Sequence, residues 1–124
     1  MDFFPVLSKL YPERTIQGQC FTFCHKLVNF GPVGNLISQK INALHRFGIP
    51  ISKLDSLKVG DVLLLNYPIF GHGAFINSIV DDKLQLTESN FNLDLRVHHT
   101  RQISPNDHKI LGVFRGSIII PIPN

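Results

Sequence analysis

The sequence predicts an α+β domain in which N-terminal helices pack on a curved antiparallel β-sheet. Up to Phe47 the apolar residues recur at helical spacing, whereas from Val62 onward they form short runs separated by turn residues. Helices first and strands afterwards are typical of this class. The 124 residues, 44% of them hydrophobic, suffice for one packed domain over residues 1–124.

The helical part divides into three segments. A short helix is expected over Val6–Leu10. A second one starts at Cys20 and runs to Phe30, because its polar residues form a single stripe and Gly31-Pro32 then stops it. A third covers Asn35–Phe47, where apolar residues recur every three or four positions before Gly48.

The second half of the chain reads as strands. The expected strands are Val62–Leu65, Gly71–Val80, Lys83–Glu88, Arg96–Arg101 and Ile110–Phe114. The last apolar stretch, Ser117–Ile122, is expected to pair as an edge strand or to pack on a partner chain, because an exposed strand of this kind tends to aggregate.

Charge and hydropathy exclude several classes of protein. The net charge is +3, but the basic residues are scattered, which argues against nucleic-acid binding. No apolar run approaches the ~20 residues of a membrane span. Residues 1–14 lack the basic and apolar regions of a signal peptide. A protein acting outside the cell would then be released from the cytoplasm by lysis or carried in a virion.

The two cysteines differ in their expected chemistry. Cys20 lies at the first turn of a predicted helix, where free N–H groups and the helix dipole favour a thiolate and hence a nucleophile. Cys24 lies one turn deeper and is expected to pack in the core. Their spacing on one helix is poor for a disulfide, so both are expected to be free thiols. A small buried hydrophobe is the alternative role for Cys20.

A thiolate nucleophile needs a base, and the base needs an orienting partner. His72 begins an apolar strand. Glu88 ends the next strand and continues the inward face of Leu84 and Leu86. A carboxylate on that face needs a partner, and an imidazole is a fitting one.

The hairpin between these two residues sets a condition on the site. An uninterrupted two-residue turn at Asp81-Asp82 would put His72 and Glu88 on opposite faces of the sheet. We therefore predict a three- or five-residue loop, or a β-bulge, between them. The same register makes Ala74 the small residue that lets the Cys20 helix approach, and leaves Phe75 on a mixed, outward face.

Four short motifs occur in order: Gly-Gln-Cys at a helix start, Gly-Asp before a strand, Gly-His-Gly-Ala, and Glu-x-Asn. Together they resemble the CHAP domain, a family of papain-like cysteine, histidine-dependent amidohydrolases and peptidases that cleave peptidoglycan. The resemblance covers residues 16 to 115. It implies the following roles: Cys20 as nucleophile, His72 as general base, Glu88 as its orienting partner, Asn90 as an additional polar residue that holds His72 together with Glu88, and Gln19 as an oxyanion ligand.

Two positions depart from the family. Some members bind calcium through an aspartate-rich loop before the cysteine, but here that loop has only Glu13 as an acid, so no metal or other cofactor is expected. Phe91 stands where the family often has Trp. Phe70 and Phe91 are expected to line a substrate groove, with core packing as the alternative.

The resemblance implies a peptidoglycan hydrolase of the kind found in phage endolysins, an amidase or endopeptidase acting through an acyl-enzyme. The alternative is a non-catalytic structural or wall-binding module, such as a virion component. A zinc site at Cys20, Cys24 and His25 is disfavoured because no second ligand pair exists. His98 and His99 must point to opposite faces of a strand and are expected at the surface.

Overall fold

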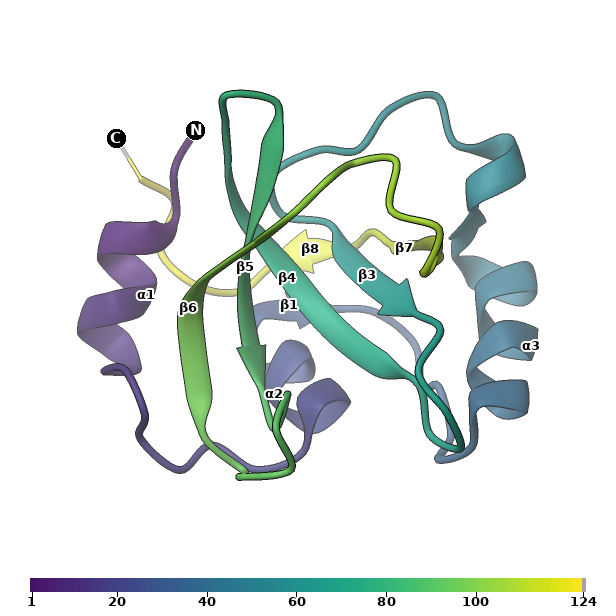
Figure 1. The fold of residues 1–124 in the computed structure, drawn as a ribbon, viewed down its shortest axis with the longest axis horizontal. Coiled ribbons are helices and arrows are strands. Elements are labelled where there is room, and N and C mark those ends of the chain that lie inside the picture. The colour runs from purple at the N-terminus through teal and green to yellow at the C-terminus, as the bar shows by residue number, and fades with distance from the viewer. Residues whose placement is uncertain (124) are drawn as a thin grey trace.

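The computed structural model describes residues 1–123, in which three α-helices pack against an antiparallel β-sheet (Figure 1). The helices are α1 (Phe4–Leu10), α2 (Cys20–Leu27) and α3 (Ile37–Phe47). This confirms the mixed α+β class predicted from the sequence. No helix in the described part of the chain is both long and apolar enough to span a bilayer.

The main sheet has six strands in the order β2-β7-β3-β4-β5-β6. Their bounds are β2 (Ile49–Pro50), β3 (Val62–Leu65), β4 (His72–Val80), β5 (Lys83–Ser89), β6 (Val97–Ile103) and β7 (Ile110–Phe114). A short 3-10 helix, η1 (Ile51–Lys53), follows β2. The central strands β3, β4 and β5 are adjacent both in sequence and in space. The two-residue turn between β4 and β5 brings the start of β4 beside the end of β5.

A separate two-stranded sheet ties the C-terminal segment to α2. It consists of β1 (Val28–Asn29) and β8 (Ser117–Ile118). The helix was predicted to reach Phe30, but it ends at Leu27 because the next two residues pair with β8. Pairing of the C-terminal stretch was predicted correctly, although only its first two residues form a strand.

The start of α3 also differs from the prediction, which placed it at Asn35. The helix begins at Ile37, because the Gln39 side-chain oxygen accepts hydrogen bonds from the backbone N–H groups of Asn35 and Leu36. A side chain that reaches back to the N–H groups before a helix satisfies donors that have no intrahelical partner. Residues 35 and 36 therefore form a cap instead of a first turn.

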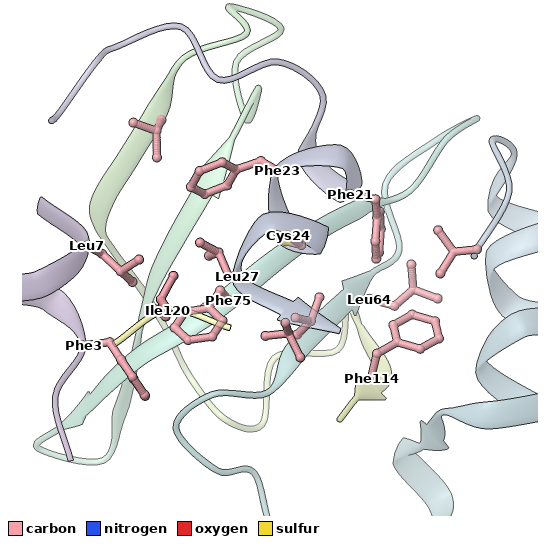
Figure 2. Close-up of a cluster of buried hydrophobic side chains, with 14 of the residues drawn as sticks. Phe3, Leu7, Phe21, Phe23, Cys24, Leu27, Leu64, Phe75, Phe114 and Ile120 are labelled. Atoms are coloured by element: carbon pink, nitrogen blue, oxygen red, sulfur yellow. The ribbon is translucent and has the colours of Figure 1, made fainter. Parts of the chain in front are cut away.

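The sheet buries both of its faces. One face packs against the helices through a cluster drawn in Figure 2, which includes Phe3, Phe23, Leu27, Phe75 and Phe114. Phe75 was predicted on an outward face. This prediction was wrong because α1 and α2 cover that face: the rings of Phe3 and Phe75 pack edge-on with centroids 5.5 Å apart. The opposite face carries a second apolar cluster under the loops, with Leu63, Leu65, Ala74, Ile76, Leu84, Leu86, Ile110 and Val113.

A β-bulge at Asn77 interrupts the β4–β5 hairpin. Near the Asp81-Asp82 turn Val80 pairs with Lys83, but beyond the bulge Ile76 pairs with Leu86, one position out of step. Both turn residues have positive φ, at 51° and 60°, as a two-residue type I′ turn requires. The predicted irregularity between His72 and Glu88 is thus confirmed as a bulge within β4 and not as a longer loop.

Candidate active site

The nucleophile candidate Cys20 is the first residue of α2, and three backbone contacts fix the turn before it. The N–H groups of Gln17 and Gly18 donate to the Leu95 carbonyl at 2.9 and 3.1 Å, and the Ser89 hydroxyl donates to the Gly18 carbonyl at 2.6 Å. Gly18 has φ at +90°, a conformation that favours glycine. The turn therefore presents Cys20 at the helix N-terminus beside the end of β5.

Helix α2 approaches β4 over Gly73. A Cβ atom built on this residue would lie 2.8 Å from the Phe21 ring, so a larger residue would force that ring to move. The role had been assigned to Ala74, but that side chain belongs to the opposite apolar cluster. The correction follows from alternation along the strand: Gly73 is the neighbour that faces the helix. Its backbone N–H lies near the Cys20 sulfur and helps to lower the pKa of that thiol.

His72 and Glu88 meet at the end of the sheet nearest to Cys20. His72 Nε2 lies 2.8 Å from Glu88 Oε1, and both side chains are buried. The His72 ring also lies close to the Cys20 thiol, near enough to lower the pKa of that thiol. Since Nε2 contacts the carboxylate, Nδ1 is the ring nitrogen left for the sulfur. The imidazole therefore stands between a thiol and a carboxylate, as in a nucleophile–base–orienter triad.

Arg101 on β6 holds the carboxylate from its other side. Its Nε donates to Glu88 Oε2 and its Nη2 to Oε1, both at 2.8 Å, which makes a two-pronged ion pair. The guanidinium also lies over the Phe91 ring, 3.8 Å from its centroid. Sequence reasoning missed this residue. A buried Glu88 calls for a cation, but the sequence offers 12 Lys and Arg residues, and only strand pairing selects one.

The ionisation of Cys20 and His72 is coupled. Burial raises the pKa of the Cys20 thiol, but the interaction with His72, the Gly73 N–H and the charge of Lys40 together outweigh burial, and the net pKa is lowered. For His72, burial lowers the pKa, whereas its contacts with Cys20 and Glu88 raise it to about 9. Both shifts favour the thiolate–imidazolium pair at neutral pH. Such a pair is the reactive form of a catalytic cysteine.

Two further ionisable groups near the site, Glu88 and Cys24, have pKa values that are shifted in opposite directions. Burial raises the pKa of Glu88, but hydrogen bonds from Arg101 and His72 lower it below the usual value, so this carboxylate stays ionised. Burial raises the pKa of Cys24 well above that of an ordinary thiol. Both cysteines are free, as expected. Only Cys20 has the surroundings of a thiolate.

Asn90 and Gln19 form a second polar pair beside the triad. Asn90 Nδ2 donates to Gln19 Oε1 at 3.0 Å, and Asn90 Oδ1 accepts from the Leu95 N–H at 2.9 Å. Within residues 1–123 these are the side-chain bonds of Asn90, so it orients Gln19 and not His72. Because its oxygen is engaged, Gln19 keeps its NH₂ group for another acceptor, as an oxyanion ligand would.

Two hollows meet at Cys20. One, of about 240 Å³, is lined by His72, Tyr67 and Phe91 among others, and the second, of about 370 Å³, by Thr22, Asn35 and Lys40. Gln19, Cys20 and Phe70 line both. The sulfur is thus placed between two halves of one cleft.

The two aromatic residues expected in a groove line this cleft. Phe70 is 47% exposed at the point where the two hollows join. Phe91 packs against His72, with ring centroids 5.6 Å apart, and its ring face contacts the Arg101 guanidinium. Phe70 therefore presents an accessible apolar surface, whereas Phe91 also serves as packing for the triad.

Three further histidines contact partners other than Cys20. His99 was predicted at the surface but is buried, because α1 and the segment after it cover this part of β6: its Nε2 contacts the Tyr11 carbonyl at 2.6 Å and its Nδ1 the Thr87 hydroxyl at 3.0 Å. His98 lies between Glu13 and Asp94. His25 stacks on Phe30. Over residues 1–123 no three His, Cys, Asp or Glu side chains gather as metal ligands.

Comparisons with known proteins found no match to this chain. The sequence matches no family model or curated protein, and the structure matches no solved structure. The site is defined by its own geometry: a cysteine at a helix start, a histidine at a strand start, and a carboxylate held by an arginine.

Proposed function

We propose that this protein is a cysteine-dependent amidase or peptidase that cleaves an amide bond through an acyl-enzyme. One observation carries the proposal: the buried His72 imidazole contacts the Cys20 thiol and the Glu88 carboxylate at once. A purely structural cysteine has no need of a histidine with a raised pKa at its side. The open cleft on both sides of the sulfur gives a substrate access to it.

The proposed reaction follows from the roles of the side chains. The Cys20 thiolate attacks the amide carbonyl, and Gln19 donates to the oxygen that becomes negative. The His72 imidazolium then gives its proton to the departing amine, and the acyl-thioester remains. Neutral His72 next removes a proton from water, which attacks the thioester and returns Cys20 to its starting state. Glu88, held by Arg101, stabilises the imidazolium and keeps its ring oriented.

We further propose bacterial peptidoglycan as the substrate. The support is the resemblance of the four motifs, in their order, to the CHAP domain, whose members cleave this polymer. Residues of three of these motifs also support it: Gln19, Cys20, His72 and Asn90 line one hollow, and Glu88 contacts His72. The cleft is open along both sides of Cys20, which suits a peptide strand that runs past the nucleophile. Release by lysis or carriage in a virion would bring the protein to this substrate.

The experiment measures new amino groups released from purified peptidoglycan. The wild type is compared with Cys20→Ala and with Cys24→Ala, a matched loss of the second thiol one turn away. Release by the wild type and by Cys24→Ala, but not by Cys20→Ala, would support the proposal. Addition of EDTA is expected to leave the rate unchanged. If the wild type releases no more than Cys20→Ala from any wall type, the non-catalytic alternative is favoured.

A further inference from the structure

The half of the cleft away from His72 contains a buried cation. Lys40, on α3, is 4% exposed and lines the hollow that also includes Thr22 and Asn35. Its ammonium donates to the Phe70 carbonyl at 2.6 Å and to the Asn35 carbonyl, and so joins the two chain segments that form this wall. An ammonium has three N–H donors, so one remains after these two bonds.

This cation has no anionic side chain beside it. Over residues 1–123, no carboxylate lies within ion-pair distance of Lys40, whereas Arg101 and Arg115 each have one. Burying a charge is costly unless it is paired. Two carbonyl dipoles and the nearby Cys20 thiolate offset part of that cost. An anion that enters the hollow would provide the missing full charge.

The position of His72 indicates which half of the cleft binds the acyl part of the substrate and which binds the amine part. This step rests on the acyl transfer proposed above. The departing amine must receive its proton from His72, which lines only the smaller hollow. The acyl part of the substrate then extends into the larger hollow, toward Lys40. Thr22 and Asn35 supply further polar groups there, and the remaining lining of this half carries no acidic side chain.

We propose that the Lys40 hollow is a carboxylate-binding subsite, so that the preferred substrate carries an anionic group on the acyl side of the cleaved amide bond. A γ-linked glutamyl residue with a free α-carboxylate is an acyl group of this chemical class. The ammonium would contact the carboxylate through its remaining N–H, and Asn35 or Thr22 would donate to the second oxygen. A neutral amide in the same place would leave the charge unpaired.

The test compares two alkylating reagents of similar size on Cys20: iodoacetate, which is anionic, and iodoacetamide, which is neutral. Their rate ratio cancels any change in thiolate content, because both reagents need the same thiolate. Lys40→Met keeps the length of the side chain and removes its charge. We expect this variant to lower the iodoacetate-to-iodoacetamide ratio roughly three- to tenfold, as expected for the loss of one nearby charge in a partly screened site.

Two variants serve as controls. Lys40→Arg retains a cation and should keep most of the wild-type ratio, and Lys26→Met removes an exposed lysine from α2 and should leave the ratio unchanged. An equal decrease of both rates in Lys40→Met would overturn the proposal, because Lys40 would then act on the thiolate alone. If Lys40→Met does not fold, the wild type decides: glutarate must protect Cys20 from iodoacetamide better than glutaramide does, and equal protection overturns the subsite.

The alkylation test does not depend on hydrolysis, so the two proposals can fail separately. A lowered ratio in Lys40→Met together with no release of amino groups from peptidoglycan would leave an anion site in a non-catalytic protein. Hydrolysis with an unchanged ratio would keep the enzyme and remove the subsite. If both hold, paired peptides with a γ-glutamyl carboxylate or its amide give the specificity directly, and Lys40→Met should lose the preference for the carboxylate.

Discussion

His72 Nε2 and Glu88 Oε1 lie 2.8 Å apart because Asn77 is an extra residue in the strand between them. Without it, the Asp81-Asp82 turn would pair His72 with Phe91 and turn Glu88 to the other face. The side chain of this bulge residue is hydrogen-bonded to the next two strands of the sheet, β5 and β6. Its side-chain NH₂ donates to the Thr87 hydroxyl at 2.9 Å and to the His99 carbonyl at 3.0 Å.

We predict that Asn77→Ala destabilises the protein by about 1–3 kcal/mol, because it leaves a buried hydroxyl and a buried carbonyl without their donor. Urea unfolding gives the free energy of unfolding. Asn66→Ala is the matched control, since Asn66 is exposed. The reactivity of Cys20 should fall in Asn77→Ala as the register loosens. Equal stability of the two variants would mean that the bulge does not depend on this side chain.

Cys20 is predicted to be the reactive thiol of the pair. Its pKa is lowered by the His72 contact despite burial, whereas burial raises that of Cys24. Limiting iodoacetamide at neutral pH, followed by peptide mass mapping, should label Cys20 first. In Cys20→Ala the remaining thiol should stay unlabelled in the folded protein and become labelled in urea. Labelling of Cys24 before Cys20 in the wild type would contradict the assignment.

The pH dependence of hydrolysis is predicted to be bell-shaped. On the acidic side activity rises as Cys20 loses its proton, which its lowered pKa places below the range of an ordinary thiol. On the alkaline side activity falls near pH 9, because His72, with its pKa raised to about 9, no longer carries the proton for the leaving amine. Alkylation by iodoacetamide needs no acid, so its rate should show the acidic limb alone. If the rate of alkylation also fell at alkaline pH, the alkaline limb of hydrolysis would be due to unfolding and not to His72.

Arg101 is predicted to act on the reaction through Glu88. Arg101→Gln removes a cation that lowers the pKa of this carboxylate, so that pKa should rise and Glu88 should become protonated at a higher pH. The acidic limb of the activity profile is then expected to move to higher pH, with a loss of about 10- to 100-fold in kcat/KM near neutrality. Arg101→Lys keeps the charge and should recover part of the loss.

The matched control for this variant is Arg115→Gln. Arg115 makes a comparable two-pronged pair with Asp61, at 2.7 and 3.1 Å, and its ion pair lies outside both hollows at Cys20. Both variants are expected to lower the free energy of unfolding, by about 1–3 kcal/mol, because each leaves a buried carboxylate without its guanidinium partner. Only Arg101→Gln should move the pH profile. A profile that moves equally in both would reduce Arg101 to a structural role.

Local chemistry in the sequence predicted much of the candidate site. Cys20 was found because a helix start is visible from periodicity, and Glu88 because strand alternation places it on an apolar face. The need for an odd-length loop or a bulge between His72 and Glu88 also followed from counting along two strands. Arg101 and Lys40 were not found, because a basic side chain carries no local sign of the group it will contact. His99 was assigned to the surface because alternation shows which face a residue points to, but not whether another element covers that face.

The sequence by itself determined the α+β class, the central strands and the residue types of the triad, since these depend on periodicity, turn residues and side-chain chemistry between near neighbours. The tertiary structure alone decided where the irregular register falls, how the two cations are placed, and that α2 packs over Gly73 rather than Ala74. It also decided that β1 and β8 shorten the second helix. Each of these depends on contacts between segments far apart in the chain, whose energies no local pattern contains.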